Sequence, residues 1–234
     1  MVELQIKNSA EKLEINPSKI IALGLNYLDH VKESVSQKTT NDTNIPEEPV
    51  LFNKTPNVLI GNDEDIVIPK FLERYSFANP RVDYEAELAI IIGKMAKNIS
   101  ESEVSDYILG YTCMNDVSQR NLQTGDQSGW FRGKSLDTFG PIGPSIIRPE
   151  DIGDPHNLDI RCRLNGEIVQ SSNTSQMIFK IPEIVSFVSS NFTLQKGDII
   201  MTGTPAGVGP ISNGDVVEIE IENIGVLKNR VIEE

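Results

Sequence analysis

The chain contains little of what would tie it to a disulfide framework, a secretory route or a membrane. Only two cysteines, Cys113 and Cys162, occur among its 234 residues, without a Cys-x-x-Cys pair, so we expect buried thiols in a reducing compartment. The amino-terminal segment lacks an apolar core of signal-peptide length, and no run approaches the roughly 20 apolar residues of a membrane span. We therefore expect a soluble, cytoplasmic protein.

Basic residues are also scarce, with 21 lysines and arginines against 34 aspartates and glutamates, for a formal net charge of −13. The field of such a chain repels polyanions, which argues against nucleic acid or an anionic membrane as a partner. A small anionic substrate would need a local cationic pocket. Apolar residues make up 38% of the chain, enough for a substantial core without disulfides.

Short strand-like runs dominate the sequence, whereas helical patterns are few. The 13 prolines and 17 glycines are spread along the chain, which fits many tight turns and opposes a regular βαβ array. We predict one β-rich mixed α/β domain over residues 1–234, with residues 1–19 as an amino-terminal extension and the polar, turn-rich residues 34–49 as a mobile lid. The strand-like runs are Ile20–Leu23, Val58–Ile60, Ile66–Ile68, Val82–Ile92, Ile199–Met201 and Val216–Ile221.

Three segments have clearer local signatures. Asn165 and Gly166, between two alternating runs, predict a β-hairpin with a type I′ turn. The segment SESEVSDYILG predicts a helix with a capping box from Ser100 to Glu103 and a stop at Gly110. The segment IPEIVSFVSSN predicts a second helix, because its isoleucines and valines recur at helical period.

The segment RVDYEAELAIIIGK places Asp83, Glu85 and Glu87 at alternate positions of a predicted strand. Side chains at this spacing point to the same side, about 7 Å apart, so their charges repel. The same face continues directly into Ala89 and Ile91, and the three isoleucines that end the run indicate a strand buried on both faces. Two interpretations stay open: a solvated acidic face, or carboxylates that hold a metal or another buried cation.

Two other acidic patterns have simpler interpretations. In VVEIEIEN, Glu218 and Glu220 alternate with apolar residues, which predicts a solvated strand face. In GYTCMNDVSQRNLQ, Asp116 follows a strand-like run and precedes a possible helix. Because Asp116 and Gln119 form an acceptable capping box, a plain helix N-cap is the first interpretation of Asp116 from sequence.

One histidine stands in a suggestive context. Glu33 follows His30 by three residues and would share its face if the segment LDHVKES is helical. A carboxylate held against an imidazole raises its basicity and lets it act as a general base toward water. An exposed helical ion pair is the alternative.

Two loops suit anions or carbonyl oxygens. WFRGKSLDTFGPIGP carries Arg132 and Lys134 among aromatic residues, as an anion-binding loop or an ordinary surface loop. MTGTPAGVGP offers the hydroxyls of Thr202 and Thr204 and backbone amides next to glycines. It is not a phosphate loop, because no Gly-Lys-Ser/Thr follows.

In their order along the chain, GLNYLDHVKE, PVLFNK, VDYEAELAIIIGK, GYTCMNDVSQRNLQ, RGKSLDTFGPIGP and TGTPAGVG resemble the fumarylacetoacetate hydrolase family, in its small single-domain branch. The resemblance spans roughly residues 20–209. It implies mixed β-sheets rolled around a metal site, a few short helices and a homodimer. It also implies a Mg²⁺ or Mn²⁺ ion bound by Glu85, Glu87 and Asp116, a site that Ca²⁺ can occupy in crystals.

The same resemblance implies roles for residues around the ion. His30 and Glu33 match the dyad that activates water, and Lys134 matches a lysine that binds a substrate oxygen or stabilises an enolate. Asp83 lies beside the ligands without binding the ion. The implied substrate-binding residues are Tyr27, Gln123 and Thr204.

The implied activity is hydrolysis of a C–C bond in a 2,4-dioxo acid through an enolate that the metal stabilises, as in aromatic compound catabolism. The alternatives are an oxaloacetate-type decarboxylase, a 2-hydroxy-diene-dioate isomerase, and a catalytically silent ligand-binding protein. The substrate would be a small 2-oxo acid. Leu25 stands where many members have an arginine, and this loss of a cation near the entrance makes a dicarboxylate substrate less certain.

Overall fold

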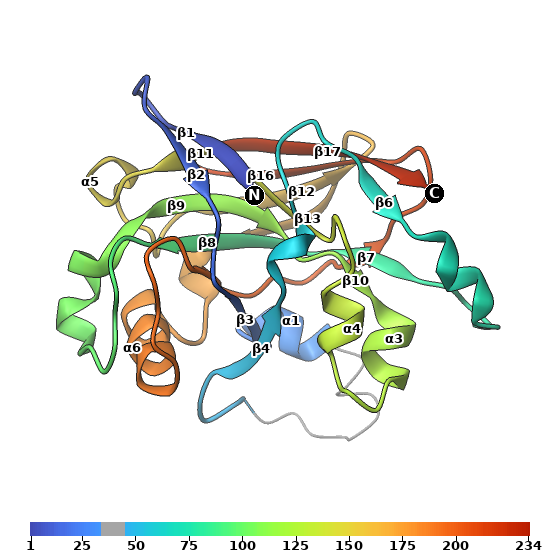
Figure 1. The fold of residues 1–234 in the computed structure, drawn as a ribbon, viewed down its shortest axis with the longest axis horizontal. Helices are drawn as coiled ribbons and strands as arrows, with labels where there is room; N and C mark the ends of the chain where they lie inside the picture. Colours follow the sequence, from blue (N-terminus) through green and yellow to red (C-terminus); the bar gives the residue numbers. More distant parts are fainter. Residues whose placement is uncertain (34–44) are drawn as a thin grey trace.

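The structure is a computed structural model that describes residues 1–33 and 45–234, without the side chains of residues 32 and 33. Strands dominate it, and the long strands β8 (Ala86–Ile92) and β9 (Ile108–Asn115) cross its centre (Figure 1). The predicted β-rich mixed α/β fold is confirmed. In the part of the chain described, no helix is long and apolar enough to cross a membrane.

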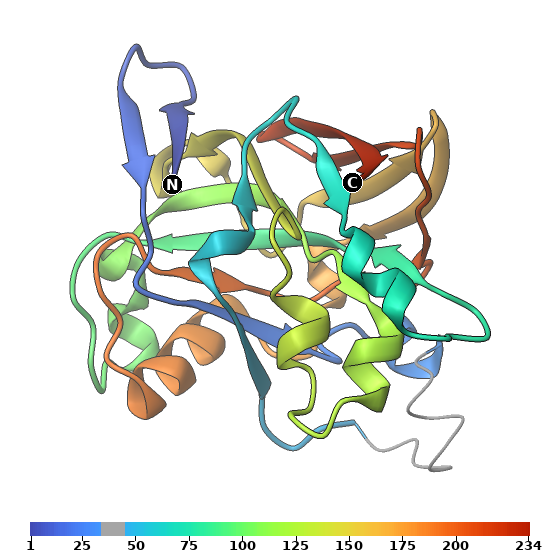
Figure 2. The same ribbon diagram turned by 45° about the vertical axis from the view of Figure 1, so that its right-hand side comes forward.

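The strands of residues 1–33 and 45–234 form three sheets. The largest has the order β2-β1-β11-β9-β8-β14-β3-β4, with β5 paired to β11. Besides β8 and β9, its strands are β1 (Val2–Ile6), β2 (Lys12–Ile15), β3 (Ile20–Gly24), β4 (Val50–Lys54), β5 (Leu59–Ile60), β11 (Gly140–Ile147) and β14 (Ile199–Met201). The hairpin of β1 and β2 projects at the upper left of Figure 2.

The two smaller sheets complete the strand layers. One has the order β10-β7-β15 and consists of β10 (Ser118–Gln119), β7 (Val82–Tyr84) and β15 (Gly209–Pro210). The other has the order β13-β12-β16-β17-β6 and consists of β13 (Glu167–Asn173), β12 (Asp159–Leu164), β16 (Val216–Ile221), β17 (Gly225–Glu233) and β6 (Ile66–Ile68). Asn165 and Gly166 join β12 to β13 with φ values of 53° and 86°, which confirms the predicted type I′ hairpin.

Helices are short and few among the described residues. The α-helices are α1 (Leu28–Glu33), α3 (Arg120–Gly125), α4 (Phe131–Lys134), α5 (Pro149–Ile152) and α6 (Ile181–Asn191), and the 3₁₀ helices are η1 (Pro56–Val58), η2 (Lys70–Arg74), η3 (Glu101–Tyr107) and η4 (Thr174–Gln176). Helix α6 confirms the second predicted helix. The first one is wrong at its end: its capping box forms, but η3 stops at Tyr107 and Ile108 already starts β9.

Strand β8 is buried on both faces, as the isoleucine run predicted. Leu88 and Ile90 belong to a core cluster that includes residues of α6, β12 and β16. Ala89 and Ile91 belong to a second cluster with residues of β1, β3 and β14. Because alternate residues of a strand share a face, Glu87 lies on the face of this second cluster.

The chain passes from one sheet to another at Glu85. Strand β7 before it pairs with β10 and β15, whereas β8 after it pairs with β9 and β14. The predicted single strand over Val82–Ile92 is therefore interrupted at this residue. The backbone N–H of Glu85 donates to Oδ1 of Asn115 at 3.0 Å, which satisfies a donor that the break leaves outside the sheet.

Candidate functional site

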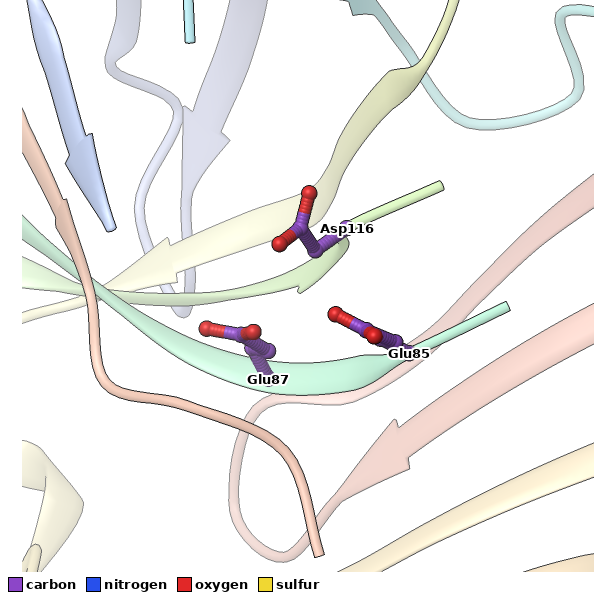
Figure 3. Close-up of side chains that lie close together, drawn as sticks. All are labelled: Glu85, Glu87 and Asp116. Carbon is purple, nitrogen blue, oxygen red and sulfur yellow. The ribbon is translucent and has the colours of Figure 1, made fainter. Parts of the chain in front are cut away.

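Three buried carboxylates converge where β8 begins and β9 ends. Glu85, Glu87 and Asp116 each offer an oxygen atom, and these atoms lie within 4.8 Å of one another. The residues are only 4%, 1% and 0% exposed, and Figure 3 shows their carboxylates turned toward a common centre. This arrangement decides against a solvated acidic stripe.

Antiparallel pairing explains why these residues meet. In the register of β8 and β9, Ala86 is opposite Asn115 and Glu87 is opposite Met114, so Asp116 follows directly beside Glu85. The backbone N–H of Asp116 donates to the carbonyl oxygen of Glu85 at 2.9 Å. The interpretation of Asp116 as a helix N-cap is wrong, because α3 begins at Arg120 and is capped by Gln119.

Two buried lysines balance part of this charge. Lys134 Nζ donates to Glu85 Oε2 at 2.7 Å and to Asp116 Oδ2 at 2.6 Å. Lys54 Nζ donates to the other oxygen of Asp116 at 2.6 Å and to the carbonyl of Val117 at 3.3 Å. Asp116 is therefore held from two sides by ammonium groups, as a fully buried carboxylate requires.

Arg120 links Asp83 to the carboxylate cluster. Its Nε donates to Asp83 Oδ2 at 2.7 Å and its Nη2 to Glu85 Oε1 at 2.5 Å. Arg81 Nε occupies the other oxygen of Asp83 at 2.7 Å. The structure thus places Asp83 outside the set of three and in contact with the arginine that contacts Glu85.

The electrostatics of the cluster differ from one carboxylate to the next. Burial favours the neutral form of Glu85, but the charges of Arg120, Lys134 and His30 outweigh it and hold the pKa of Glu85 below its usual range. Burial raises the pKa of Glu87 well above the usual carboxyl value, and the charges of Asp116 and Glu85 raise it further. The site thus stabilises Glu85 as a carboxylate, whereas burial opposes the ionisation of Glu87.

The two lysines also differ. Burial lowers the pKa of the Lys54 ammonium, against the attraction of Asp116. Burial acts in the same direction on Lys134, but the charges of Asp116 and Glu85 prevail and raise its pKa above the usual lysine value. Lys134 is therefore a firmly protonated group at the centre of the site.

Loop 202–208 follows β14 and brings its backbone to the cluster. Gly203 N–H donates to Glu87 Oε2 at 2.7 Å. The glycine amide that sequence suggested for a ligand carboxylate thus binds a carboxylate of the protein itself. Thr204 follows directly, 3% exposed, and its Oγ1 accepts a hydrogen bond from Gln170 at 2.9 Å.

The remaining predicted site residues lie around this cluster. Tyr27 is fully buried, its hydroxyl has no hydrogen-bond partner among the described residues, and burial together with the charge of Glu87 raises its pKa. Gln123 accepts from Arg120 Nη1 at 2.9 Å. His30, in α1, is near enough to lower the pKa of Glu85, and the Glu33 side chain lies outside the described residues.

The two cations of the predicted anion-binding loop, Arg132 and Lys134, contact different partners. Both lie in the short helix α4 rather than in a loop, and Lys134 points to the carboxylates. Arg132 instead contacts Asp126 and donates to Tyr75 Oη at 2.6 Å. The structure does not bring the two cations together. Of the predicted lid, residues 34–44 lie outside the described residues.

Sequence reasoning missed three residues that hold the site together: Lys54, Arg120 and Gln170. Lys54 ends a short apolar strand, and Gln170 lies in a hairpin strand, so neither stands out by pattern. Arg120 follows Asp116 by four residues, but only the sheet register shows that it reaches both Asp83 and Glu85.

The cluster suits a hard divalent cation. All three ligand atoms are oxygens, as Mg²⁺ and Mn²⁺ prefer. Burial is the main cause of the raised pKa of Glu87, and the charges of Asp116 and Glu85 add to it, so a cation placed beside these acids would favour the ionised form of Glu87. Two buried polar atoms beside the carboxylates, Tyr27 Oη and Asn115 Nδ2, have no hydrogen-bond partner in the described part of the chain. Both atoms can therefore form hydrogen bonds to a bound group.

Comparison with known proteins identifies the family. Residues 19–232 match the family described as fumarylacetoacetate (FAA) hydrolase C-terminal. The chain belongs to the fumarylacetoacetate hydrolase family. The mitochondrial oxaloacetate tautomerase fahd2 of Xenopus laevis is 43% identical over 227 residues, which cover 93% of this chain and 66% of that protein.

Solved structures of the family have the same fold. The 5-carboxymethyl-2-hydroxymuconate delta-isomerase of Mycobacterium smegmatis is 40% identical with a TM-score of 0.80, over 94% of this chain and 78% of that one. A maleylpyruvate hydrolase from Sphingobium sp. SYK-6, in complex with manganese(II) and pyruvate, is 33% identical with a TM-score of 0.76, over 93% and 71%. Family members are therefore enzymes that include isomerases, hydrolases and tautomerases.

Proposed function

We propose that this protein uses Mg²⁺ or Mn²⁺ to stabilise the enolate of a small 2-oxo acid. The buried set of Glu85, Glu87 and Asp116 carries the proposal, because three buried carboxylates converge there and their oxygen atoms suit such an ion. When bound, the ion polarises a carbonyl group and stabilises negative charge on its oxygen. The manganese and pyruvate in the maleylpyruvate hydrolase relative support this choice of ion and substrate class.

The chain's own groups supply binding and charge around the ion. Lys134, buried and protonated, is assigned to the substrate oxygen that becomes negative, where a low-dielectric setting makes its charge most effective. The centroid of the Phe52 ring lies 5.0 Å from its Nζ, which adds a cation–π contact to the lysine. Gln123 and Thr204 are assigned to the carbonyl and carboxylate groups of the substrate, and Tyr27 to the pocket wall near Glu87.

His30 is assigned the proton transfer. Its influence on the pKa of Glu85 indicates that the imidazole lies near the ion site, and an imidazole titrates close to neutral pH. In the keto–enol reaction it would take or return a proton at the carbon next to the carbonyl. In hydrolysis it would activate water together with Glu33, a pairing that stays a prediction.

Keto–enol tautomerisation or isomerisation is the reaction that the site supports best. It needs only a stabilised enolate and a proton carrier, and the described residues include candidates for both. Relatives named oxaloacetate tautomerase and delta-isomerase are 43% and 40% identical, which supports the same ranking. Hydrolysis of a 2,4-dioxo acid, which the sequence alone favours, is the second candidate, supported by the 33% identical maleylpyruvate hydrolase. We also propose that the protein acts as a homodimer.

The test is a comparison of three reactions in Mn²⁺-loaded protein: ketonisation of enol oxaloacetate, decarboxylation of oxaloacetate and cleavage of acetylpyruvate. We expect ketonisation to be the fastest and to disappear in Glu85→Gln. Glu220→Gln is the matched control, because Glu220 lies on β16 and pairs with Arg163 of β12, outside the carboxylate cluster. Faster cleavage of acetylpyruvate would favour hydrolysis, and no turnover despite Mn²⁺ and oxalate binding would identify a catalytically silent ligand-binding protein.

A further inference from the structure

We infer that Gln170 occupies one acceptor position of the Thr204 hydroxyl and leaves its hydrogen for the ligand, so that this part of the site favours a group that accepts hydrogen bonds, such as a substrate carboxylate. The identity of the ligand rests on the proposed function. The polarity of Thr204, in contrast, follows from the hydrogen bonds of the protein alone.

Gln170 is a fully enclosed side chain between two parts of the site. It belongs to β13, is 1% exposed, and reaches from this hairpin strand to the start of β8 and to loop 202–208. Its Oε1 accepts from the backbone N–H of Ala86 at 3.0 Å. Its Nε2 donates to Thr204 Oγ1 and to the carbonyl of Pro205, both at 2.9 Å.

The orientation of this carboxamide is determined at both ends. A backbone N–H can only donate and a backbone carbonyl can only accept. Ala86 therefore requires the oxygen of Gln170, and Pro205 requires its nitrogen. With the nitrogen on that side, Thr204 Oγ1 must accept, because the amide nitrogen has no acceptor capacity.

The hydroxyl hydrogen of Thr204 is consequently available for a ligand. A hydroxyl has one hydrogen and two lone pairs, and within residues 1–33 and 45–234 no acceptor is found for this hydrogen. Thr202 is different, because its Oγ1 donates to the carbonyl of Leu88 at 3.0 Å. Of the two threonines that the sequence suggested, only Thr204 keeps its donor, next to the glycine that binds Glu87.

The class of ligand follows from this polarity. An ionised carboxylate has only acceptors, and its hydrogen bond to a buried hydroxyl is strengthened by its charge. An ammonium or a protonated amine at the same place could use only the remaining lone pair of Thr204 Oγ1 and would leave the buried hydroxyl hydrogen without an acceptor. Gln170 is thus a positioning residue that favours acids over amines at Thr204 without touching the ligand.

A double-mutant cycle tests the inference. The dissociation constant of oxalate is measured by calorimetry on Mn²⁺-loaded protein for the parent, Thr204→Val, Gln170→Met and the double variant. We expect each single variant to bind oxalate about tenfold more weakly, as loss of one charge-assisted hydrogen bond implies. The double variant should be no weaker than Thr204→Val, because Gln170 acts only through the hydroxyl.

Several outcomes would overturn the inference. One is an unchanged dissociation constant of oxalate in Gln170→Met. Another is a dissociation constant about a hundredfold higher in the double variant, which would mean that the two residues act independently. Gln170→Glu replaces Gln170→Met in the cycle if the latter does not fold, because its ionised carboxylate would accept from Thr204 and turn the hydroxyl away. Gln5→Met, at an exposed position of β1, should bind oxalate like the parent. A parent that binds Mn²⁺ but no oxalate would instead overturn the proposed function.

Discussion

Lys134 Nζ lies 2.6 Å from Oδ2 of Asp116 and 2.7 Å from Oε2 of Glu85, and so it contacts two of the three carboxylates proposed to hold the ion. An ammonium and a metal ion would therefore compete for these carboxylates. Without the ion, the lysine offsets the charge of the buried acids. With an ion bound, hydrogen bonds of Lys134 would become available to a substrate oxygen.

Replacing Lys134 with methionine should separate metal binding from catalysis. We expect tighter Mn²⁺ binding in calorimetry, because the competing charge is gone, and a turnover lower by about 10²-fold, as for other preorganised donors. The metal-free variant should be destabilised by about 3–5 kcal/mol, since buried carboxylates lose their partner. Weaker Mn²⁺ binding would refute the competition between ion and ammonium.

Lys54 should matter for stability more than its place at the end of β4 indicates. Lys54→Met leaves Asp116 Oδ1 without the ammonium that now lies 2.6 Å away, and we expect a loss of about 3 kcal/mol in urea unfolding without metal. Saturating Mn²⁺ should restore part of this loss. Lys12→Met, which removes an exposed ion pair with Glu3, is the control and should change little. An unchanged urea midpoint for Lys54→Met would be inconsistent with a buried ion pair.

Asp198, directly before β14, makes a pH-dependent contribution to the free energy of unfolding. Although burial opposes its ionisation, hydrogen bonds from Gln195, Lys19 and Ser18 lower its pKa. A lowered folded-state pKa means that the stabilisation is complete above the unfolded value, about 3.9, and is lost as the pH falls through the lower folded value. Asp198→Asn should cost about 1–3 kcal/mol at pH 7. Urea titrations should show this difference shrinking only below about pH 4, and a constant difference down to pH 2 would contradict the assignment.

His30→Ala should lower turnover by about 10²-fold or more, which general-base assistance is typically worth, with Mn²⁺ affinity nearly unchanged. Glu33→Gln should have the same effect on hydrolysis if the predicted dyad forms. Decarboxylation, which needs no activated water, should suffer less. Steady-state rates on oxaloacetate and acetylpyruvate measure these effects, and hydrolysis at the parental rate in both variants would remove the dyad.

The two-sided burial of β8 was predictable because three consecutive isoleucines leave no polar face, and the Asn165-Gly166 turn because both residues tolerate positive φ. The break at Glu85 was not predictable, because it arises from long-range pairing: β7 pairs with β15, whereas β8 pairs with β9. The alternation of Glu218 and Glu220 predicted a solvated face, but both are half-buried and paired with cations of neighbouring strands.

Sequence alone could single out only some of the polar residues of the site. Glu85 and Glu87 could be singled out because acids leading into an apolar run are unfavourable without a cation. Asp116 has a local capping pattern that the register of β9 overrides. Gln170 and Lys54 gain their importance only from long-range contacts, over sequence separations of 84 to Ala86 and 62 to Asp116.

The central claim is that Glu85, Glu87 and Asp116 bind one Mg²⁺ or Mn²⁺ ion, and calorimetric titration of the metal-free protein tests it most directly. We expect one Mn²⁺ per chain in the parent, with a stabilisation of about 2.7 kcal/mol at 100 times the dissociation constant. Glu85→Gln should abolish both the binding and the rise in melting temperature, whereas Glu220→Gln should retain them. Absence of binding in the parent, or equally tight binding in Glu85→Gln, would contradict the account.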